Sequence, residues 1–165
     1  MRRPEPDPVG AGEESVWDYP RPPRVERVGE RVSIHLGGVR IADTVEAVRV
    51  LETSHPPVYY LPIEAFVEGA LTPAEGSTFC EFKGAAAYLD FHGGTRVARK
   101  AAWTYPQPAP GYEHLAKRVA VYAGDMDACT VGGERVTPQP GRFYGGWITS
   151  RIRGPFKGEP GSMGW

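Results

Sequence analysis

Cysteine is nearly absent from this sequence, which holds only Cys80 and Cys129 in 165 residues. Two thiols are too few for the disulfide framework of a small secreted domain or for a zinc site of four cysteines. A zinc site of mixed ligands would need both cysteines and two histidines, and these residues have no metal-ligand spacing between them. We therefore expect neither a metal site nor a bound cofactor.

Long apolar runs and a strong net charge are also lacking. No stretch of about 18 apolar residues occurs, so we expect no membrane-spanning segment. The basic start, residues 1–3, is followed by the Pro-rich residues 4–8 instead of the apolar stretch of a signal peptide, which favours a cytoplasmic location. A formal net charge of -1 argues against general nucleic-acid binding, which uses a strongly basic surface.

Glycine and proline, by contrast, are abundant. The 21 Gly and 17 Pro make up about 23% of the chain, where about 12% is usual. Because both residues interrupt helix interiors, this composition excludes a helical bundle or a coiled coil. The four Trp, eight Tyr and six Phe supply apolar bulk that a disordered chain lacks. The composition thus indicates a folded domain with little helix.

The pattern Gly-Gly-x-Arg-Ile/Val occurs three times, with its glycine pairs at 37–38, 93–94 and 132–133. Tight hairpin turns need residues that adopt positive φ, so each pair predicts a hairpin. Three hairpins in a small chain predict a mainly β fold of antiparallel sheets. One short helix is expected near 111–118, after Pro110, because apolar residues recur there at helical spacing.

The chain divides into three parts by composition. Residues 1–14 have no hydrophobic periodicity and are expected to form a disordered tail. Residues 15–136 hold the predicted strands and are expected to form a single β domain. Residues 137–165 are rich in Gly, Pro and aromatic residues, and are too apolar for a pure linker. We expect this C-terminal extension to wrap around the domain or around a partner subunit.

A short motif occurs twice within the predicted domain. Trp-x-Tyr-Pro-x-Pro spans residues 17–22 and again residues 103–108. One interpretation is an internal duplication, with two related half-units that are each bordered by this segment. The other is that both copies are edge strands that end at proline. The sequence alone leaves both interpretations open.

Three further segments carry a resemblance to a known family. They are Glu52–Pro62 (ETSHPPVYYLP), Phe79–Tyr88 (FCEFKGAAAY) and Ala101–Pro106 (AAWTYP). In this order they resemble the bacterial domain-of-unknown-function family four-two-seven over roughly residues 25–125. The resemblance implies a small, mostly β domain described as a β-tent of coiled antiparallel sheets. The family is sometimes labelled nucleotidyltransferase-like, but it supplies no catalytic residue that could be transferred to this chain.

The residues themselves do not carry the chemistry of that label. Nucleotidyl transfer uses two or three carboxylates around Mg²⁺ together with a glycine-rich or basic phosphate cradle. Asp125-Met126-Asp127 is the sole Asp-x-Asp and lies in a predicted loop, where such pairs usually mark a solvated turn. No phosphate-binding loop of the Walker type is present.

His55 is the strongest candidate for chemistry, because it lies at the mouth of a predicted strand and Glu52 lies close in sequence. A neutral imidazole there would act as a general base or a hydrogen-bond donor, with Glu52 orienting the ring. The alternative is a structural role, in which His55 anchors the Pro56-Pro57 turn through a backbone carbonyl. Cys80 is either a partner of His55 or a buried thiol.

Candidate ligand-binding residues are basic or aromatic. Lys83 precedes Gly84, where a backbone can approach an anionic ligand closely. Tyr59 and Tyr60 are adjacent on a predicted strand, so one faces the core and the other faces outward. Trp103 and Trp147 would either line a concave wall for a small ring, an amide or a cation, or cap the ends of a thin core.

We therefore expect a cytoplasmic, homodimeric β domain that binds an unidentified small molecule. The homodimer is expected because open sheet edges invite pairing. The expected pocket is lined by His55, Tyr59, Lys83, Trp103 and Trp147. The first alternative is an enzyme, either nucleotidyltransferase-like or a hydrolase with a Glu/His acid–base pair. The second is a structural module for protein interaction that uses the Pro-rich ends.

Overall fold

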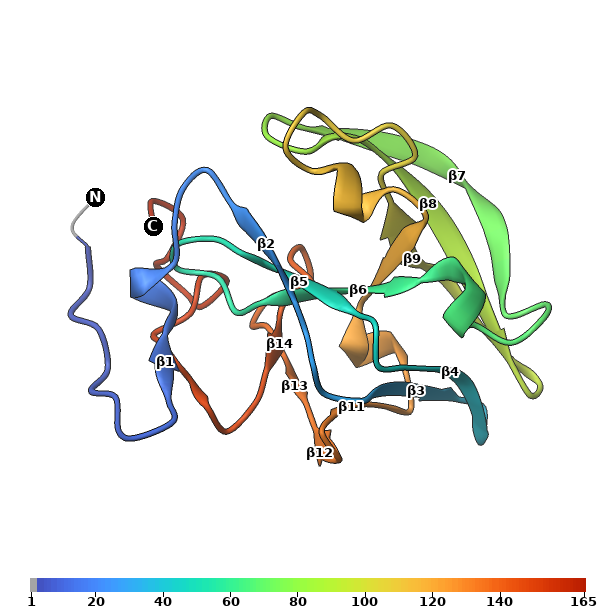
Figure 1. Ribbon diagram of the computed structural model, residues 1–165, viewed down its shortest axis with the longest axis horizontal. Helices are drawn as coiled ribbons and strands as arrows, with labels where there is room; N and C mark the ends of the chain where they lie inside the picture. Colours follow the sequence, from blue (N-terminus) through green and yellow to red (C-terminus); the bar gives the residue numbers. More distant parts are fainter. Residues whose placement is uncertain (1–2) are drawn as a thin grey trace.

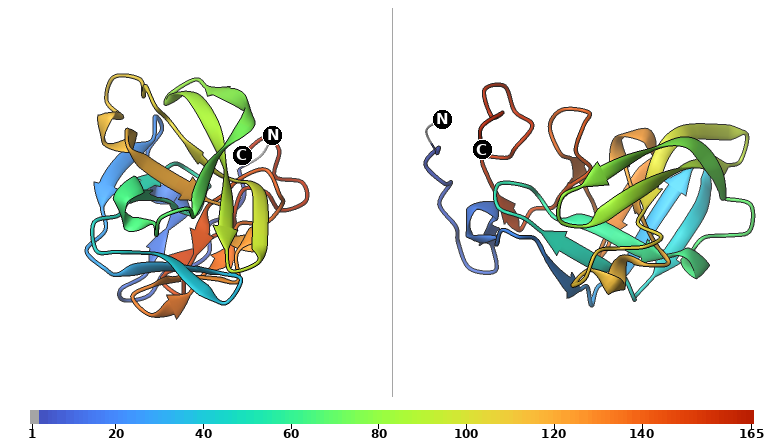
Figure 2. Two further views of the ribbon diagram at one scale, coloured as in Figure 1. Left: turned by 90° about the vertical axis from the view of Figure 1, so that its right-hand side faces the viewer. Right: turned by 90° about the horizontal axis from the view of Figure 1, so that it is seen from above.

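The computed structural model describes residues 3–165, so the first two residues of the predicted tail lie outside it. Residues 3–13 form neither helix nor strand, and within them the backbone N–H of Asp7 donates to the Gly154 carbonyl at 2.9 Å. Figures 1 and 2 show that the two ends of the described chain lie at the same end of the molecule.

The fold is mainly β, as the sequence predicts, and its largest sheet has seven antiparallel strands. In spatial order the strands are β2 (Arg24–Arg27), β5 (Val48–Leu51), β6 (Val58–Pro62), β10 (Arg118–Val121), β9 (Arg96–Thr104), β8 (Gly84–Gly93) and β7 (Leu71–Cys80). The long β7–β8–β9 meander rises above the rest of the molecule in Figure 1.

A second antiparallel sheet of four strands packs against one face of the first. Its strands, in spatial order, are β12 (Glu134–Arg135), β11 (Ala128–Val131), β3 (Val32–Leu36) and β4 (Val39–Thr44). All three predicted hairpins are present. Their Gly-Gly pairs lie at the turns between β3 and β4, β8 and β9, and β11 and β12. Five of these six glycines have positive φ, and Gly93 is the exception.

The helices of the described residues are four short 3-10 turns: η1 (Val16–Asp18), η2 (Ile63–Ala65), η3 (Glu113–Leu115) and η4 (Ala123–Asp125). The short helix expected near 111–118 is therefore the three-residue turn η3. Positive φ at Gly111 and Lys117 takes the backbone out of helical geometry on both sides of it. In the part of the chain that the structure describes, no helix has the length and apolar character needed to cross a membrane.

The C-terminal extension packs onto the domain. Its strands are β13 (Thr137–Pro138), which pairs with β14 (Trp147–Ile148), and β15 (Ile152–Arg153), which pairs in parallel with β1 (Glu14–Ser15). The two Trp-Tyr-Pro motifs differ in conformation: Trp17 lies in η1, whereas Trp103 lies in β9.

Apolar side chains form separate cores on the two faces of the large sheet. The first core lies between the two sheets and includes Ile34, Leu61, Phe91 and the fully buried Trp147. The second lies on the opposite face of the large sheet, around Tyr60, Trp103, Tyr105, Tyr112 and Leu115.

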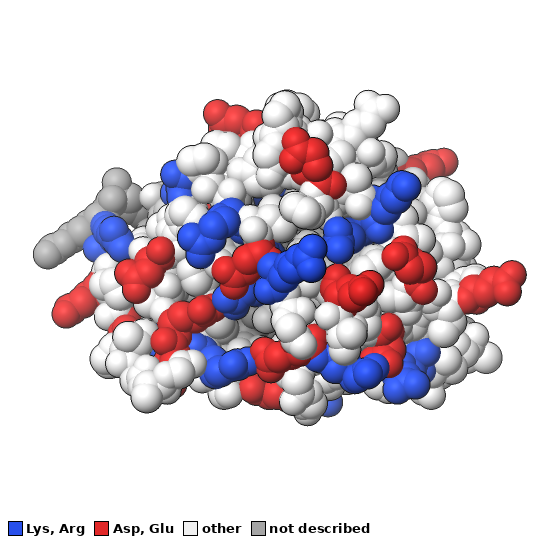
Figure 3. Space-filling view, viewed as in Figure 1, with Lys and Arg blue, Asp and Glu red and all other residues white. Residues whose placement is uncertain are grey.

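Stacked aromatic rings stabilise the first core, as in the 5.0 Å pair of Tyr59 and Trp147. The surface is mixed in charge. On the face shown in Figure 3, a diagonal row of basic side chains crosses the molecule with acidic side chains on both sides of it.

Candidate functional site

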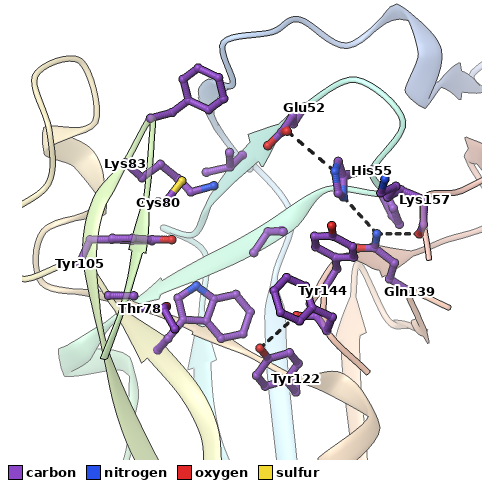
Figure 4. Close-up of a pocket in the computed structure, with 18 of the residues that line it drawn as sticks. Glu52, His55, Thr78, Cys80, Lys83, Tyr105, Tyr122, Gln139, Tyr144 and Lys157 are labelled. Carbon is purple, nitrogen blue, oxygen red and sulfur yellow. Dashed lines mark hydrogen bonds and ion pairs between the residues drawn. The ribbon is translucent and has the colours of Figure 1, made fainter. Parts of the chain in front are cut away.

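A cavity of about 560 Å³ opens on the face of the large sheet that carries the second core. Its walls come from the segment between β5 and β6, the turn between β7 and β8, strand β9 and the C-terminal extension (Figure 4). Ten of its lining residues are Phe, Tyr or Trp: Tyr60, Phe79, Phe82, Tyr88, Trp103, Tyr105, Tyr122, Phe143, Tyr144 and Trp165.

Strand alternation decides which residues of β6 reach the cavity. Val58 and Tyr60 line it, whereas Tyr59 points to the opposite face and belongs to the first core. Trp147 lies in that same core, where its indole N–H donates to the Val121 carbonyl at 3.1 Å. The structure therefore does not bring Tyr59 and Trp147 to the cavity that His55, Lys83 and Trp103 share.

Trp103 lines the cavity and is only 8% exposed. Its indole N–H donates to the Tyr60 hydroxyl at 3.3 Å, and its ring centroid lies 4.6 Å from that of Tyr122. The backbone of Gly145 passes directly against this ring, because a Cβ at that position would collide with it. The ring is thus held from several sides in one orientation.

His55 is held in the cavity wall by a turn between β5 and β6. Its backbone N–H donates to the Glu52 carbonyl at 3.0 Å, and the turn passes through Ser54 at a φ of 74°. The His55 side chain is 13% exposed, and its ring packs edge-on against Tyr144 with centroids 4.7 Å apart.

Gln139 determines the tautomer of His55. The Gln139 side-chain oxygen accepts the backbone N–H of Gly146 at 3.0 Å, so its amide nitrogen faces the other way. That nitrogen donates to the Lys157 carbonyl at 2.8 Å and lies 3.1 Å from Nδ1 of His55. Since the amide is a donor, Nδ1 must accept and the proton of the neutral ring sits on Nε2. Figure 4 shows this chain of contacts on one side of the cavity.

Burial keeps His55 neutral. It lowers the pKa of the ring to about 3, and the nearby charges of Arg21, Lys83 and Lys157 act in the same direction. The Nε2 atom lies 3.8 Å from the Glu52 carboxylate. With Nδ1 occupied and Nε2 protonated, the ring has no free lone pair for a general base. The Glu52–His55 arrangement therefore suits hydrogen-bond donation into the cavity better than proton abstraction.

Basic side chains lie on both sides of the cavity. Lys83 is half-buried in the turn after β7, with its Nζ 6.0 Å from the centroid of the Tyr105 ring. Lys157 is buried, and Arg21 pairs with Glu52 at 3.5 Å. Figure 4 shows Lys83 and Tyr105 on one side, facing His55 and Lys157 on the other.

The other residues considered for catalysis or metal binding do not lie together in one place. Cys80 is half-buried in the cavity wall, and no hydrogen bond joins it to His55 within residues 3–165. Cys129 lies in the first core, where burial raises the pKa of its thiol to about 12. The Asp127 carboxylate accepts the Gly38 backbone N–H at 2.8 Å and bonds Arg96 at 3.1 Å, so it links two hairpins.

Metal ligation finds no support among the described residues either. No group of three or more His, Cys, Asp or Glu side chains lies close enough together to hold a metal ion in the described part of the chain.

Several residues of the cavity were not singled out by sequence reasoning, chiefly Gln139, Tyr144 and Lys157 of the C-terminal extension. Gln139 is one of only two glutamines in the chain, and this rarity is the one signal that the sequence holds for it. The extension was expected to wrap around the domain or a partner, but nothing in its composition points to the turn that holds His55.

Comparison with known proteins gives one result. A family model described as "Domain of unknown function (DUF427)" matches residues 24–132. The short name of that model refers to nucleotide transfer, while its description assigns no function. No curated protein matches the chain.

Proposed function

The chain belongs to the DUF427 family, whose description assigns no activity, and we propose from the structure of its cavity that it is a domain that binds small molecules. The occupant of the cavity is a planar ligand with an aromatic or heteroaromatic ring. The single observation that carries this proposal is the concave, aromatic-walled cavity around Trp103.

The size and lining of the cavity support this function. A volume of about 560 Å³ falls within the range of roughly 300–1,000 Å³ typical of small-molecule sites. The rings of Trp103 and Tyr122 offer faces and edges on which a flat ligand can stack. Burial raises the pKa of Tyr60 and Tyr105, so their hydroxyls stay protonated and can donate hydrogen bonds to such a ligand.

Binding is favoured over catalysis by the state of the polar groups in the cavity. Its acidic side chains are Glu52, which pairs with Arg21, and the exposed Glu81. His55 has one ring nitrogen occupied by Gln139 and the other protonated. These groups are fixed donors and acceptors, as expected of a recognition site.

The proposal is tested by nuclear magnetic resonance with ¹⁵N-labelled protein and a panel of planar ring compounds. A ligand in the cavity shifts the indole N–H resonance of Trp103, whereas that of Trp147 in the opposite core stays in place. The same spectrum therefore reports both the location of the ligand and the integrity of the fold.

A matched pair of variants provides a second test of ligand binding in the cavity. We expect Tyr144→Ala, which removes a ring from the rim, to weaken binding about five- to tenfold. Met163→Ala, at an exposed residue of the same extension, leaves binding unchanged. The proposal is wrong if no compound moves the Trp103 resonance at millimolar concentration, or if the two variants bind alike.

A further inference from the structure

We propose that the ligand is an organic anion, in which a flat ring carries a carboxylate or a phosphate group. This inference rests on the proposed function and adds the charge and the orientation of the ligand. The ring lies on Trp103, and the anionic group lies between Lys83 on one side of the cavity and His55 and Lys157 on the other.

The charge of the cavity departs from that of the whole protein. The chain carries a formal net charge of -1, yet four basic side chains and only two acidic ones line the cavity. Glu52 balances Arg21, and Glu81 is exposed to solvent. Arg142 is exposed as well, but Lys83 is half-buried and Lys157 is buried, and within residues 3–165 neither lysine has a carboxylate at ion-pair distance, so the cavity holds an excess of positive charge.

Lys157 gives the strongest support for an anionic ligand, because its ammonium group is buried and no carboxylate of the described residues lies at ion-pair distance from it. The residue is 8% exposed, and its Nζ donates to the carbonyls of Ser162 at 2.8 Å and Met163 at 2.5 Å. An ammonium has three N–H donors, so one of them has no acceptor among the described residues. Burying an uncompensated charge is costly, and an anion in the adjoining cavity would offset that cost.

Lys83 approaches the same space from the opposite side, as Figure 4 shows. It is half-buried in the turn that leads into Gly84, and its carbonyl is tied to the Ala109 N–H at 2.9 Å. Charges that face a partly enclosed space are screened less than charges on an open surface, so their attraction for an anion is stronger.

His55 supplies a directed donor next to these charges. Because Gln139 fixes the proton on Nε2, the ring presents an N–H in the wall without a charge of its own. Neutral donors and ammonium groups together are the usual partners of carboxylate and phosphate oxygens. Figure 4 shows Tyr122 away from His55, Lys83 and Lys157, and the Trp103 ring centroid lies 4.6 Å from that of Tyr122, so we place the ring of the ligand at this end of the cavity and its anionic group at the other.

The test compares pairs of compounds that differ only in charge, by isothermal titration calorimetry. The pairs are 1-naphthoate with 1-naphthamide and indole-3-acetate with indole-3-acetamide, and a further arm uses phenyl phosphate with phenol. We expect the anion of at least one pair to bind ten times more tightly than its neutral partner, and this preference to shrink with added salt. The arm that shows the preference distinguishes carboxylate from phosphate recognition.

Variants of Lys83 assign the preference to the cavity. Lys83→Met keeps the apolar stem and removes the charge, so it should reduce the preference about tenfold while affinity for the neutral partner is kept. Lys83→Arg should restore the preference. Lys117→Met is the matched control, because Lys117 is exposed and lies outside the cavity. The indole resonance of Trp147 verifies the fold of each variant.

The outcomes separate the two proposals. Equal binding of both members of every pair, or tighter binding of the neutral member, overturns the anionic ligand and leaves the ring-binding function standing. A preference that survives Lys83→Met unchanged overturns the placement of the anion. Absence of binding by every compound overturns both proposals.

Discussion

His55 receives a hydrogen bond from Gln139 on one ring nitrogen and presents the other to the cavity. The two residues lie 84 positions apart in the chain, so this pairing exists only in the folded protein. Removal of Gln139 would free Nδ1 and allow the ring to exchange tautomers. The chemistry of His55 is therefore set by the C-terminal extension and not by its own neighbours in sequence.

The lowered pKa of His55 makes stability depend on pH. The unfolded chain binds a proton at this ring below about pH 6.5, whereas the folded protein does so only near pH 3. Between these values the unfolded state binds more protons, so stability is full above pH 6.5 and is lost as the pH falls. We expect the free energy of unfolding to drop by about 1.5 kcal/mol between pH 6.5 and pH 5, as measured by urea titration.

His55→Gln should abolish this loss, and His114→Gln should retain it, because His114 is exposed. Carboxylates with a lowered pKa, such as Glu14 and Asp43, lose their stabilising interactions at lower pH, below about 4.5. The window from pH 6.5 to 5 therefore isolates the histidine. An identical slope for wild type and His55→Gln would contradict the assignment.

Residue by residue, the sequence predicted the site in part. His55, Lys83 and Trp103, three of the five residues expected to line one pocket, line the same cavity as Glu52, and their role in binding or catalysis stays a prediction. Alternation in β6 was also predicted, but alternation alone does not say which face holds the cavity. Tyr59 was chosen as a ligand-binding residue, and the structure places Tyr60 in the cavity instead.

At the scale of elements, two glycine turns from different sheets meet. A Cβ on Gly37 would collide with the Gly93 carbonyl, and a Cβ on Gly93 would collide with that of Leu36. The β3–β4 and β8–β9 turns can touch only because both positions lack a side chain. Glycine in these pairs thus serves close packing as well as positive φ.

This contact predicts different costs for two adjacent substitutions. Gly37 and Gly38 both have positive φ, at 61° and 75°, so alanine at either costs about 1–2 kcal/mol in backbone strain. Gly37→Ala should lose about 2 kcal/mol more, because the two turns must separate. Gly38→Ala lacks this second cost, since no atom lies within 4 Å of its Cβ. Equal losses in chemical denaturation would refute the contact.

The elements that the sequence predicted well are those specified by local chemistry. Each Gly-Gly pair fixes its own turn, so the hairpins needed no tertiary information. The helix near 111–118 was predicted from spacing, but Tyr112 and Leu115 pack into the second core while Val119 lies in β10 and faces the first. The spacing of apolar residues over about two helical turns does not distinguish a helix from a short loop whose side chains enter two different cores.

At the scale of the whole molecule, the C-terminal extension completes the core. Trp147 is fully buried between the sheets, although it lies outside the family-matched residues 24–132. No pattern in the sequence indicates which face of the domain this tryptophan enters, because the choice depends on long-range packing. The homodimer expected from open sheet edges stays a prediction, and the edge strands of the large sheet are β2 and β7.

Trp147 should therefore be needed for stability. We expect Trp147→Leu to lower the free energy of unfolding by about 3 kcal/mol, since it leaves a cavity in the core and an unpaired Val121 carbonyl. Trp165→Leu, at a half-buried residue near the C-terminus, should cost about 1 kcal/mol or less. Comparable unfolding midpoints for the two variants would show that the extension is dispensable.

The same extension contributes Gln139, Tyr144 and Lys157 to the cavity, all beyond the family-matched span. One stretch of polypeptide outside that span thus serves both the core, through Trp147, and one wall of the cavity. A substitution in the last thirty or so residues can therefore alter the cavity wall and the stability of the fold together.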